Sequence, residues 1–381
     1  MALIYSHSGD ERNNVAKALR KYLTRQNKSL KKEKIIIKPN MVDPLIPDAC
    51  TNAQTLQAVV NVLKEFGAKK ILFGDEPASY FIQLQRRNGQ QYDWKQDHKS
   101  LGFDKIKGAK SLNLDDLTTT SYRATRLNPY TTQEEAIQIP IRDTSGYRVV
   151  SLALPKHHGN YNYSGVSKNL MGLVPQDRRV EFFHYSIWTA AKQMLEREQN
   201  RTLNPRNEGD SFEINLREDR LVDEFVEKYC ELRGQNKFTH KGILQKVYNA
   251  YIDQEVDQLA LSTIIDHLIN AGSLTHLIEH VKETNKDGIY ILDATHLMKR
   301  HEHAGELVKT DFALVGNDPV DLDTLAMKRL EIDPKEVAYL DQATKTIHYN
   351  DSTPSTPQTS LIARRNIVDQ HGLPFISIPL E

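Results

Sequence analysis

The stretch from Lys156 to Leu173 concentrates side chains that bind anions and move protons. It reads KHHGNYNYSGVSKNLMGL and contains two lysines, two histidines, three asparagines and three glycines. Backbone N–H groups in such turns, with ammonium and amide side chains beside them, suit the capture of an anion, and histidine changes its charge near neutral pH. We therefore predict a catalytic group, Lys156, His157 and His158, and a ligand-binding group, Lys168, Asn169 and Gly172.

Five apolar runs, of which one directly precedes Lys156 and four lie in other parts of the chain, end in polar residues. In an open parallel sheet, ligands bind beyond the carboxyl ends of the strands, so these residues would meet at one edge. This predicts that Lys38 and Asn40 join the ligand-binding group. It also predicts a divalent cation, because hard cations prefer oxygen ligands, held by Asp75, Asp293, Asp318 and Asp323. The alternative is that these residues only form turns, which are rich in Asp, Asn, Gly and Pro.

The elements that would position these residues alternate between helix and strand. Apolar residues cover one helix face in 15–23 and again in 56–66. Thr51-x-x-Gln54 has the spacing of a capping box that begins the second helix. A strand, a helix and a strand in succession imply a right-handed parallel unit. Strand-like runs occur at 34–38, 69–73, 147–154, 289–292, 312–315 and 375–378.

The pattern predicts an α/β fold: a mostly parallel sheet with flanking helices and a helical insertion. We assign 1–195 and 286–381 to one discontinuous α/β domain, and 196–285 to the insertion. The insertion carries three successive apolar stripes, and its rhythm is compatible with a winged-helix unit. The stripes cover 221–229, 243–251 and 264–269, the last ending near Gly272.

Two further segments are polar and irregular. Residues 80–130 predict a long surface excursion and a candidate lid. The Ser/Thr/Pro-rich segment 351–360 predicts an extended connector.

Composition narrows the class of protein. The 381 residues are 39% hydrophobic, and Lys plus Arg equals Asp plus Glu at 50 each, so no overall charge attracts nucleic acid or a membrane. No apolar stretch approaches the roughly 20 residues that span a bilayer. The two cysteines, Cys50 and Cys230, cannot ligate an iron–sulfur cluster. A cytoplasmic protein is the prediction, and the sequence contains no P-loop, GxGxxG or GxSxG motif.

Other clusters have competing interpretations. His301-x-His303, with His296 nearby, has imidazoles for a transition metal, but charged neighbours favour a solvated loop. Asp318 and Asp321 could bind magnesium with Asp323, but the capping of a helix that begins at Pro319 explains the first two and is the favoured interpretation. Acidic residues within 253–266 disfavour nucleic-acid binding by the insertion.

Four segments together resemble the family catalogued as domain of unknown function 362. They read IIIKPNMV, TNAQTLQAVVNVLKEFGAKKILFGDEP, KNLMGL and ALVGNDPVDLDTLAMKRLEIDPKEVAYLDQA. The resemblance covers most of the chain outside 80–130 and 196–285. Some members carry iron–sulfur modules, a role that the two cysteines here do not support. The matching positions are Lys38, Pro39, Asn40, Gly74, Asp75, Lys168, Asn169, Gly172, Asp318, Pro319 and Asp323.

Two departures from the family pattern put a shared substrate in doubt. Leu154–His158 replaces the usual Lys-x-Lys-x-His arrangement. Residues 296–303 replace the usual glycine-rich turn after Asp293.

These observations predict a small-molecule enzyme that binds a carboxylate or phosphate at the carboxyl edge of the sheet, with a divalent metal as a candidate cofactor. The alternative is a non-catalytic ligand-sensing protein. In that case the insertion, 196–285, would contact a partner protein, a second copy or nucleic acid.

Overall fold

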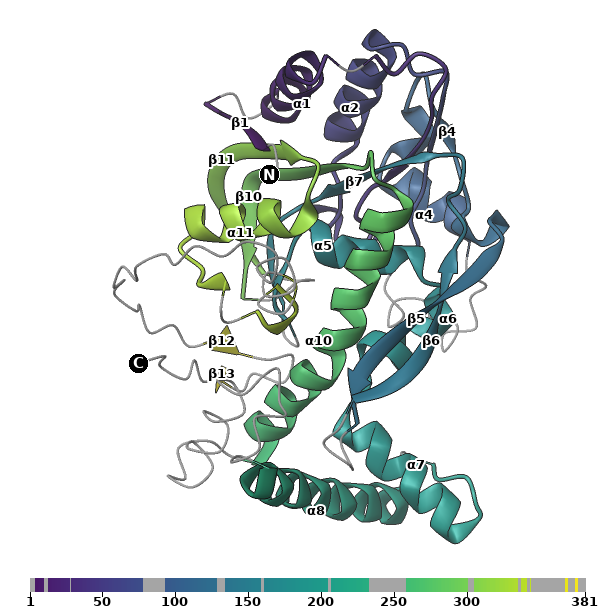
Figure 1. The fold of residues 1–381 in the computed structure, drawn as a ribbon, viewed down its shortest axis with the longest axis vertical. Coiled ribbons are helices and arrows are strands. Elements are labelled where there is room, and N and C mark those ends of the chain that lie inside the picture. The colour runs from purple at the N-terminus through teal and green to yellow at the C-terminus, as the bar shows by residue number, and fades with distance from the viewer. Residues whose placement is uncertain are drawn as a thin grey trace.

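A large sheet with helices on both faces forms the body of the chain (Figure 1). The fold is mixed α/β. The computed structural model describes residues 4–9, 13–27, 29–77, 93–128, 134–158, 161–204, 207–232, 258–300, 305–334, 337–340, 343, 367–368 and 374–375.

Over these residues the main sheet has nine strands, and it is mixed rather than purely parallel. Strands β10, β7, β2, β3 and β4 are parallel neighbours in that order, whereas β11 pairs antiparallel with both β10 and β1. Two short strands, β8 and β9, extend from β10. The bounds are β1 Ile4–Ser8, β2 Lys34–Lys38, β3 Lys70–Phe73, β4 Lys110–Ser111, β7 Arg148–Ala153, β8 Lys156–His158, β9 Asn162–Ser164, β10 Ile289–Lys299 and β11 Glu306–Gly316.

The direction of β11 corrects one prediction. Gly316, at its end, pairs with Tyr290 at the start of β10. The residues after β11 therefore lie at the edge opposite the carboxyl ends of β2, β3 and β7. The sequence predicted all the strand ends at one edge, and for β11 that was wrong.

Strands β10 and β11 are also longer than predicted. Their polar halves pair as far as Lys299 and Glu306, with a register shift between Ala294 and His296. Asp293 thus lies within β10 and not in a turn after it. The polar residues mislead because an antiparallel pair tolerates them where one of its faces meets solvent.

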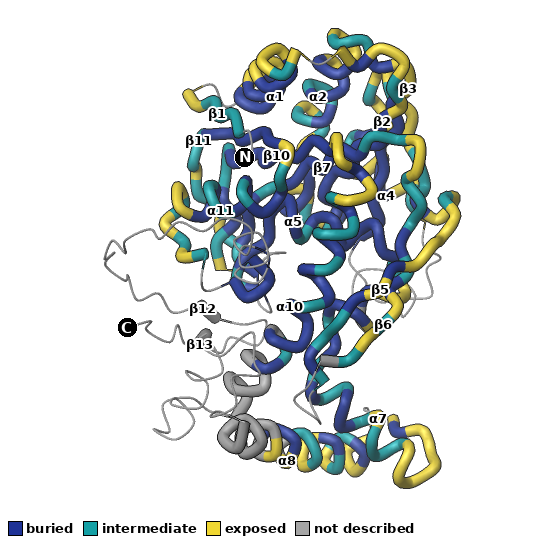
Figure 2. Tube along the Cα trace, viewed as in Figure 1, coloured by how far each residue is buried: buried dark blue, intermediate teal, exposed yellow. Residues whose placement is uncertain are grey.

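Alternate residues of the central strands enter two separate cores. In β10, Ile289 and Ile291 pack with the first core, whereas Tyr290 and Leu292 pack with the second. This is the two-residue period of a strand buried on both faces. Helices α1 and α2 cover the first face, and α5, α10 and α11 cover the second (Figure 2). The bounds are α1 Asn14–Arg25, α2 Ala53–Glu65, α5 Val166–Asn169, α10 Gln258–Thr284 and α11 Pro319–Arg329.

The predicted parallel strand–helix–strand unit is confirmed for β2, α2 and β3. Its helix, however, is capped differently. The N-cap is Asn52, whose side chain accepts from the backbone N–H of Gln54. Thr51 was predicted for this role and instead bonds Asn40, within the site described below.

The predicted helical insertion, 196–285, differs from its prediction in where one helix ends. Helix α10 does not end near Gly272 but continues to Thr284. A Cβ at Gly272 would lie 2.8 Å from the Thr125 carbonyl oxygen. The glycine is required for close packing against β5 and does not end the helix. Residues 259–274, whose spacing also suits a helix-turn-helix, lie within this single helix.

Other parts of the insertion extend away from the main sheet. Helix α8, Glu208–Leu232, packs at the far end of α10 against α7, Ile187–Gln199, which begins before the predicted insertion (Figure 1). The predicted stripe at 243–251 lies outside the described residues.

The predicted irregular excursion at 80–130 is ordered over much of its length. Strands β5, Thr119–Leu127, and β6, Glu134–Arg142, form a hairpin, in which Tyr122 and Ala124 alternate into the core and pack near α10. The charged residues of β5, Arg123 and Arg126, hid this alternation. The remaining helices are α4 Trp94–Ser100, α6 Gln176–Phe183 and the 3₁₀ turns Pro47–Ala49, Phe103–Lys105, Leu114–Asp116 and Leu170–Leu173.

Three predicted segments lie wholly or partly outside the described residues. These are the excursion and candidate lid at 80–130, of which 80–92 and 129–130 are not described, the pair His301 and His303, and the connector 351–360. The last predicted strand appears as β13, Pro374–Phe375, which pairs with β12, Ile367–Val368. None of the helices in the described ranges combines the length and the apolar character needed to cross a bilayer.

Candidate functional site

A buried ion pair joins the ends of strands β2 and β3. Lys38 is the last residue of β2, and Asp75 follows the end of β3. Because the strands are parallel neighbours, Lys38 Nζ lies 2.8 Å from Asp75 Oδ1, with side chains only 2% and 5% exposed. The second carboxylate oxygen accepts from the backbone N–H of Met41 at 3.0 Å. Burial lowers the pKa of Lys38, and the carboxylate of Asp75 opposes that change.

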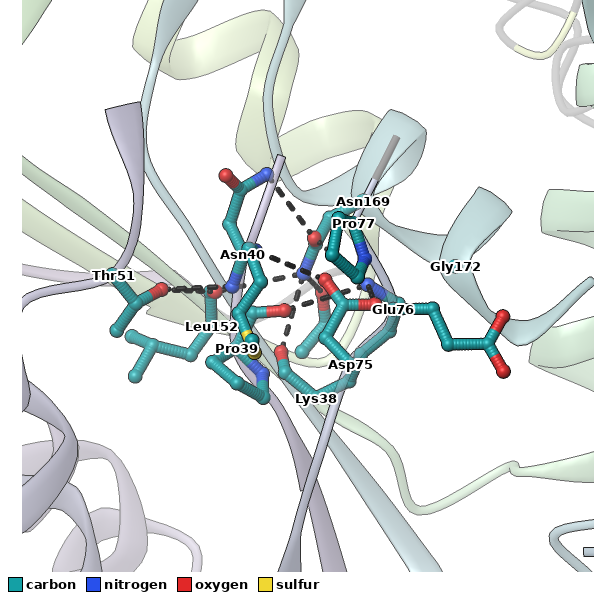
Figure 3. A network of polar contacts seen from close by, with 12 residues as sticks. Lys38, Pro39, Asn40, Thr51, Asp75, Glu76, Pro77, Leu152, Asn169 and Gly172 are labelled. Atoms are coloured by element: carbon teal, nitrogen blue, oxygen red, sulfur yellow. Dashed lines mark hydrogen bonds and ion pairs between the residues drawn. The ribbon is translucent and has the colours of Figure 1, made fainter. Parts of the chain in front are cut away.

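Asn169, the last residue of α5, connects this pair to its surroundings (Figure 3). Its Oδ1 accepts from Lys38 Nζ at 3.1 Å and from Asn40 Nδ2 at 3.4 Å. Its Nδ2 donates to Ser151 Oγ at 3.0 Å and to the Lys38 carbonyl oxygen at 3.2 Å. The amide therefore uses both ends, and it fixes Asn40 relative to the lysine.

Lys156 extends the chain of contacts from strand β8. Its Nζ donates to Asn40 Oδ1 at 2.7 Å and to the Ala49 carbonyl oxygen at 2.5 Å. The backbone of Asn40 is held by Thr51, whose Oγ1 accepts from the Asn40 N–H at 2.8 Å and whose own N–H donates back at 2.7 Å. We call the five linked side chains the lysine–asparagine network: Lys38, Asn40, Asp75, Lys156 and Asn169.

Gly172 is required by the position of Lys38. A Cβ at residue 172 would lie 2.1 Å from Lys38 Cε and 2.4 Å from Asp75 Oδ1. No side chain fits at these distances, so the lysine passes directly over the glycine backbone. Of the sequence-predicted site residues, the structure thus brings together Lys38, Asn40, Asp75, Lys156, Asn169 and Gly172.

Asp323 holds the start of helix α5. It is completely buried and accepts from the N–H groups of Val166 at 3.0 Å and Ser167 at 2.8 Å. A Cβ at Gly165 would lie 2.1 Å from Asp323 Oδ1, so this approach also needs a glycine. Burial raises the pKa of Asp323 to about 6, and the Ser167 N–H opposes the rise. Asp323 therefore positions Asn169, at the other end of α5.

The four carboxylates predicted to bind a divalent cation do not converge. Asp75 pairs with Lys38, and Asp323 caps α5. Asp293 accepts from Thr55 Oγ1 at 2.9 Å. Asp318 caps α11, accepting from the Val320 N–H at 2.9 Å, and also pairs with Lys282. Within the described ranges no group of three His, Cys, Asp or Glu side chains is arranged to hold a metal ion.

The remaining predicted residues lie beside the network. His157 and His158 are both in strand β8, not in a turn. Lys168 points to a different neighbour from Asn169, since its Nζ lies 5.1 Å from the centroid of the Tyr161 ring. His158 contacts the same ring at 5.3 Å between centroids.

Sequence reasoning missed a second buried charge group next to Asp75. Glu76 Oε2 lies 3.1 Å from Arg179 in α6, and Oε1 lies 3.5 Å from Arg142 at the end of β6. Arg142 also pairs with Asp115. Figure 3 shows Glu76 extending away from the lysine–asparagine network. The position of Glu76 directly after Asp75 could have suggested that it is part of the site. Nothing in the sequence indicated that Arg142 and Arg179 would contact it.

Glu76 should make stability depend on pH. Burial raises its pKa to about 7 from the ordinary 4.5, although Arg179 and Arg142 act to lower it. Folding therefore takes up a proton between these values, and this contribution to stability is lost as the pH rises through 7. From pH 5 to 8, wild type should lose about 2–3 kcal/mol of unfolding free energy relative to Glu76→Gln.

Urea denaturation of both proteins at several pH values measures that difference. The buried His98, whose pKa is lowered to about 4 by burial, produces an opposite slope below pH 6.5. That slope occurs in both proteins and cancels in the comparison. Parallel stability curves for wild type and variant would refute the assignment.

A surface depression of about 600 Å³ lies at the opposite edge of the sheet, at the starts of β2 and β7. Basic and acidic side chains alternate around it, and Glu33 pairs with Arg148. It provides an alternative location for an anion. Its charged lining residues are Lys32, Glu33, Lys34, Arg148, Glu283, Lys286 and Asp287.

Comparison with known proteins gives a family but no activity. A family model described as "Domain of unknown function (DUF362)" matches residues 35–328. No curated protein matches the sequence. A crystal structure of a protein from Thermotoga maritima is similar over 89% of this chain and 60% of that one, with 11% identity and a TM-score of 0.37. The chain thus spans about 60% of the length of that protein.

Proposed function

Because the chain belongs to the DUF362 family, whose description assigns no reaction, we propose a function from the geometry of its own site. We propose that the protein binds a small carboxylate or phosphate at the lysine–asparagine network and acts on it as an enzyme. One observation carries this proposal. Two ammonium groups and two amides, from the end of β2, from β8 and from α5, form a continuous hydrogen-bonded chain at the carboxyl ends of parallel strands.

The network has the donors that an anion needs. Lys156 and Asn40 contribute an ammonium and an amide side by side, and Asn40 is the most exposed member at 9%. Hydrogen bonds from charged donors to an anion are stronger than those between neutral groups. An anion would therefore approach from Asn40 and contact Lys156.

The Lys38–Asp75 pair is suited to moving a proton. The two groups lie 2.8 Å apart, and burial lowers the lysine pKa toward the range useful for acid–base catalysis. Asn169 holds the lysine in place. In this proposal the pair takes the proton-transfer role that the sequence suggested for His157 and His158. A cytoplasmic setting, supported by the low cysteine content, belongs to the same proposal.

Asn40→Asp tests anion binding with little change in shape. Asn40 Oδ1 already accepts from Lys156, so the new carboxylate would pair with that ammonium and repel an incoming anion. The lost bond from Asn40 Nδ2 to Asn169 Oδ1, 3.4 Å long, should lower the melting temperature by only a few degrees. The affinity for inorganic phosphate or acetate, measured by calorimetry, should fall by about tenfold or more.

Asn61→Asp is the matched control, because it makes the same charge change at an exposed position on α2. It should bind the probes as wild type does. Equal binding by Asn40→Asp and wild type, or no binding of any probe by wild type, would contradict the proposed function.

A ligand-sensing role without catalysis is the second candidate, and helix α8 favours it. Phe212 and Leu216 are 68% and 45% exposed and lie one helical turn apart, on one face. Such a face suits contact with a partner protein or a second copy. If sedimentation shows a dimer that Phe212→Asp with Leu216→Asp converts to monomer while phosphate binding persists, the sensing role gains support.

A further inference from the structure

Two imidazoles, a phenol ring and an ammonium group meet beside the lysine–asparagine network. The Tyr161 ring lies 5.3 Å from His158 and 6.0 Å from His184, measured between centroids, and the two imidazoles stack 6.3 Å apart. Lys168 Nζ lies 5.1 Å from the centre of the Tyr161 ring. We call these four residues the histidine cluster: His158, Tyr161, Lys168 and His184.

The cluster and the network are built on the same two elements. Strand β8 places Lys156 in the network and His158 in the cluster, both buried, with the less buried His157 between them. Helix α5 places Asn169 in the network and the adjacent Lys168 in the cluster. Residues two apart in a strand share a face, so the backbone positions that carry the two groups lie about 6–7 Å apart along β8.

The cluster is the more accessible of the two groups. Lys168 and His184 are half-buried, whereas all five members of the network are buried. The α6–α7 connection supplies His184, and its contact with Tyr161 brings a third segment to the site. A ligand that reaches the network would therefore meet cationic and imidazole groups at its outer end.

We propose that the histidine cluster is a second recognition point of the same site, and that the ligand carries two anionic groups on a short chain. This inference rests on the proposed function. One anionic group would contact Lys156 and Asn40. The other would contact Lys168 and the imidazoles of His158 and His184, which donate hydrogen bonds and carry charge when protonated. Because neighbouring positions of β8 and α5 carry the two groups, the chain between the anionic groups would be short, as in a four- or five-carbon dicarboxylate or a phosphorylated small carboxylate.

Calorimetry with one-anion and two-anion probes tests this. Acetate and inorganic phosphate carry one anionic group, and succinate, glutarate and phosphoglycolate carry two. Wild type should bind at least one two-anion probe about tenfold more tightly than the one-anion probes. Lys168→Met and His184→Gln should each lose most of that preference, measured as the ratio of the two affinities within each variant. Lys64→Met, an exposed lysine on α2, is the matched control and should keep the preference.

The outcomes separate this inference from the proposed function. If wild type binds phosphate but shows no preference for two-anion probes, or if both variants keep the preference, the second recognition point is refuted and the proposed function stands. If wild type binds neither class of probe, both fail. Circular dichroism of each variant confirms that the fold is intact, which the partial exposure of Lys168 and His184 leads us to expect.

Discussion

Replacing Asp75 with asparagine is expected to lower the free energy of unfolding by about 3–5 kcal/mol. The substitution keeps an acceptor for the Met41 N–H. It removes the negative charge that lies 2.8 Å from the buried Lys38 ammonium. A buried charge that loses its partner costs far more than the pair contributes in net stability. Urea denaturation at pH 7 measures the loss.

A double-mutant cycle separates the ion pair from other effects. Lys38→Met alone leaves the Asp75 carboxylate buried, and Lys38→Met with Asp75→Asn removes both charges. The double variant should be more stable than the sum of the two single losses predicts, by at least 1 kcal/mol, because contacting residues couple. Additive losses, or an Asp75→Asn variant as stable as wild type, would show that the pair is not an energetic unit.

Gly172→Ala is the second substitution with a large expected effect. The added methyl would lie 2.1 Å from Lys38 Cε and 2.3 Å from its Nζ, so the lysine must leave its position. Overpacking of this kind costs about 1–3 kcal/mol, and displacing Lys38 also breaks its bonds to Asp75 and Asn169. We expect a lower melting temperature and a loss of phosphate binding.

Gly209→Ala is the control for this substitution. Gly209 lies in the first turn of α8, where an added Cβ meets only Asn207 Oδ1 at 3.5 Å. Alanine is the better helix former, so this variant should be neutral or slightly stabilised. Lys38→Ala should cost less stability in the Gly172→Ala background than in wild type, because the added methyl has already displaced the lysine. If Gly172→Ala melts as wild type does, the close approach of Lys38 is wrong.

The central parallel strands and much of the candidate site could be predicted from local sequence. Apolar runs followed by polar residues predicted that Lys38, Asn40 and Asp75 would lie at one edge, and the structure places them there with Lys156 and Asn169. This worked because β2, β3 and β7 are parallel and have short connections to the site residues. The fold rules for such units leave few alternatives.

The direction of β11 was not predictable in the same way. An apolar run followed by Asp318 looks the same whether the strand runs parallel or antiparallel to its neighbour. In the structure β11 is antiparallel, so Asp318 caps α11 at the opposite edge. Helix α11 then returns along the sheet and brings Asp323 to α5. Local patterns indicate strands, whereas long-range pairing decides their direction.

Residue pairs that form only through tertiary packing could also not be predicted from the sequence. His184 and Tyr161 meet although 23 positions separate them, and neither belongs to a spacing motif. The same applies to Glu76 and Arg179. The sequence around these residues indicated helices and strands, but the packing of those elements decides which residues become partners.

The most direct measurement of the central claim is a crystal structure of the protein with inorganic phosphate at a concentration near its measured dissociation constant. Our account places the phosphate at the carboxyl ends of β2 and β7, within hydrogen-bonding distance of Lys156 Nζ and the Asn40 side chain. Phosphate found instead in the depression near Lys32, Lys34 and Arg148, with the lysine–asparagine network unchanged, would contradict it.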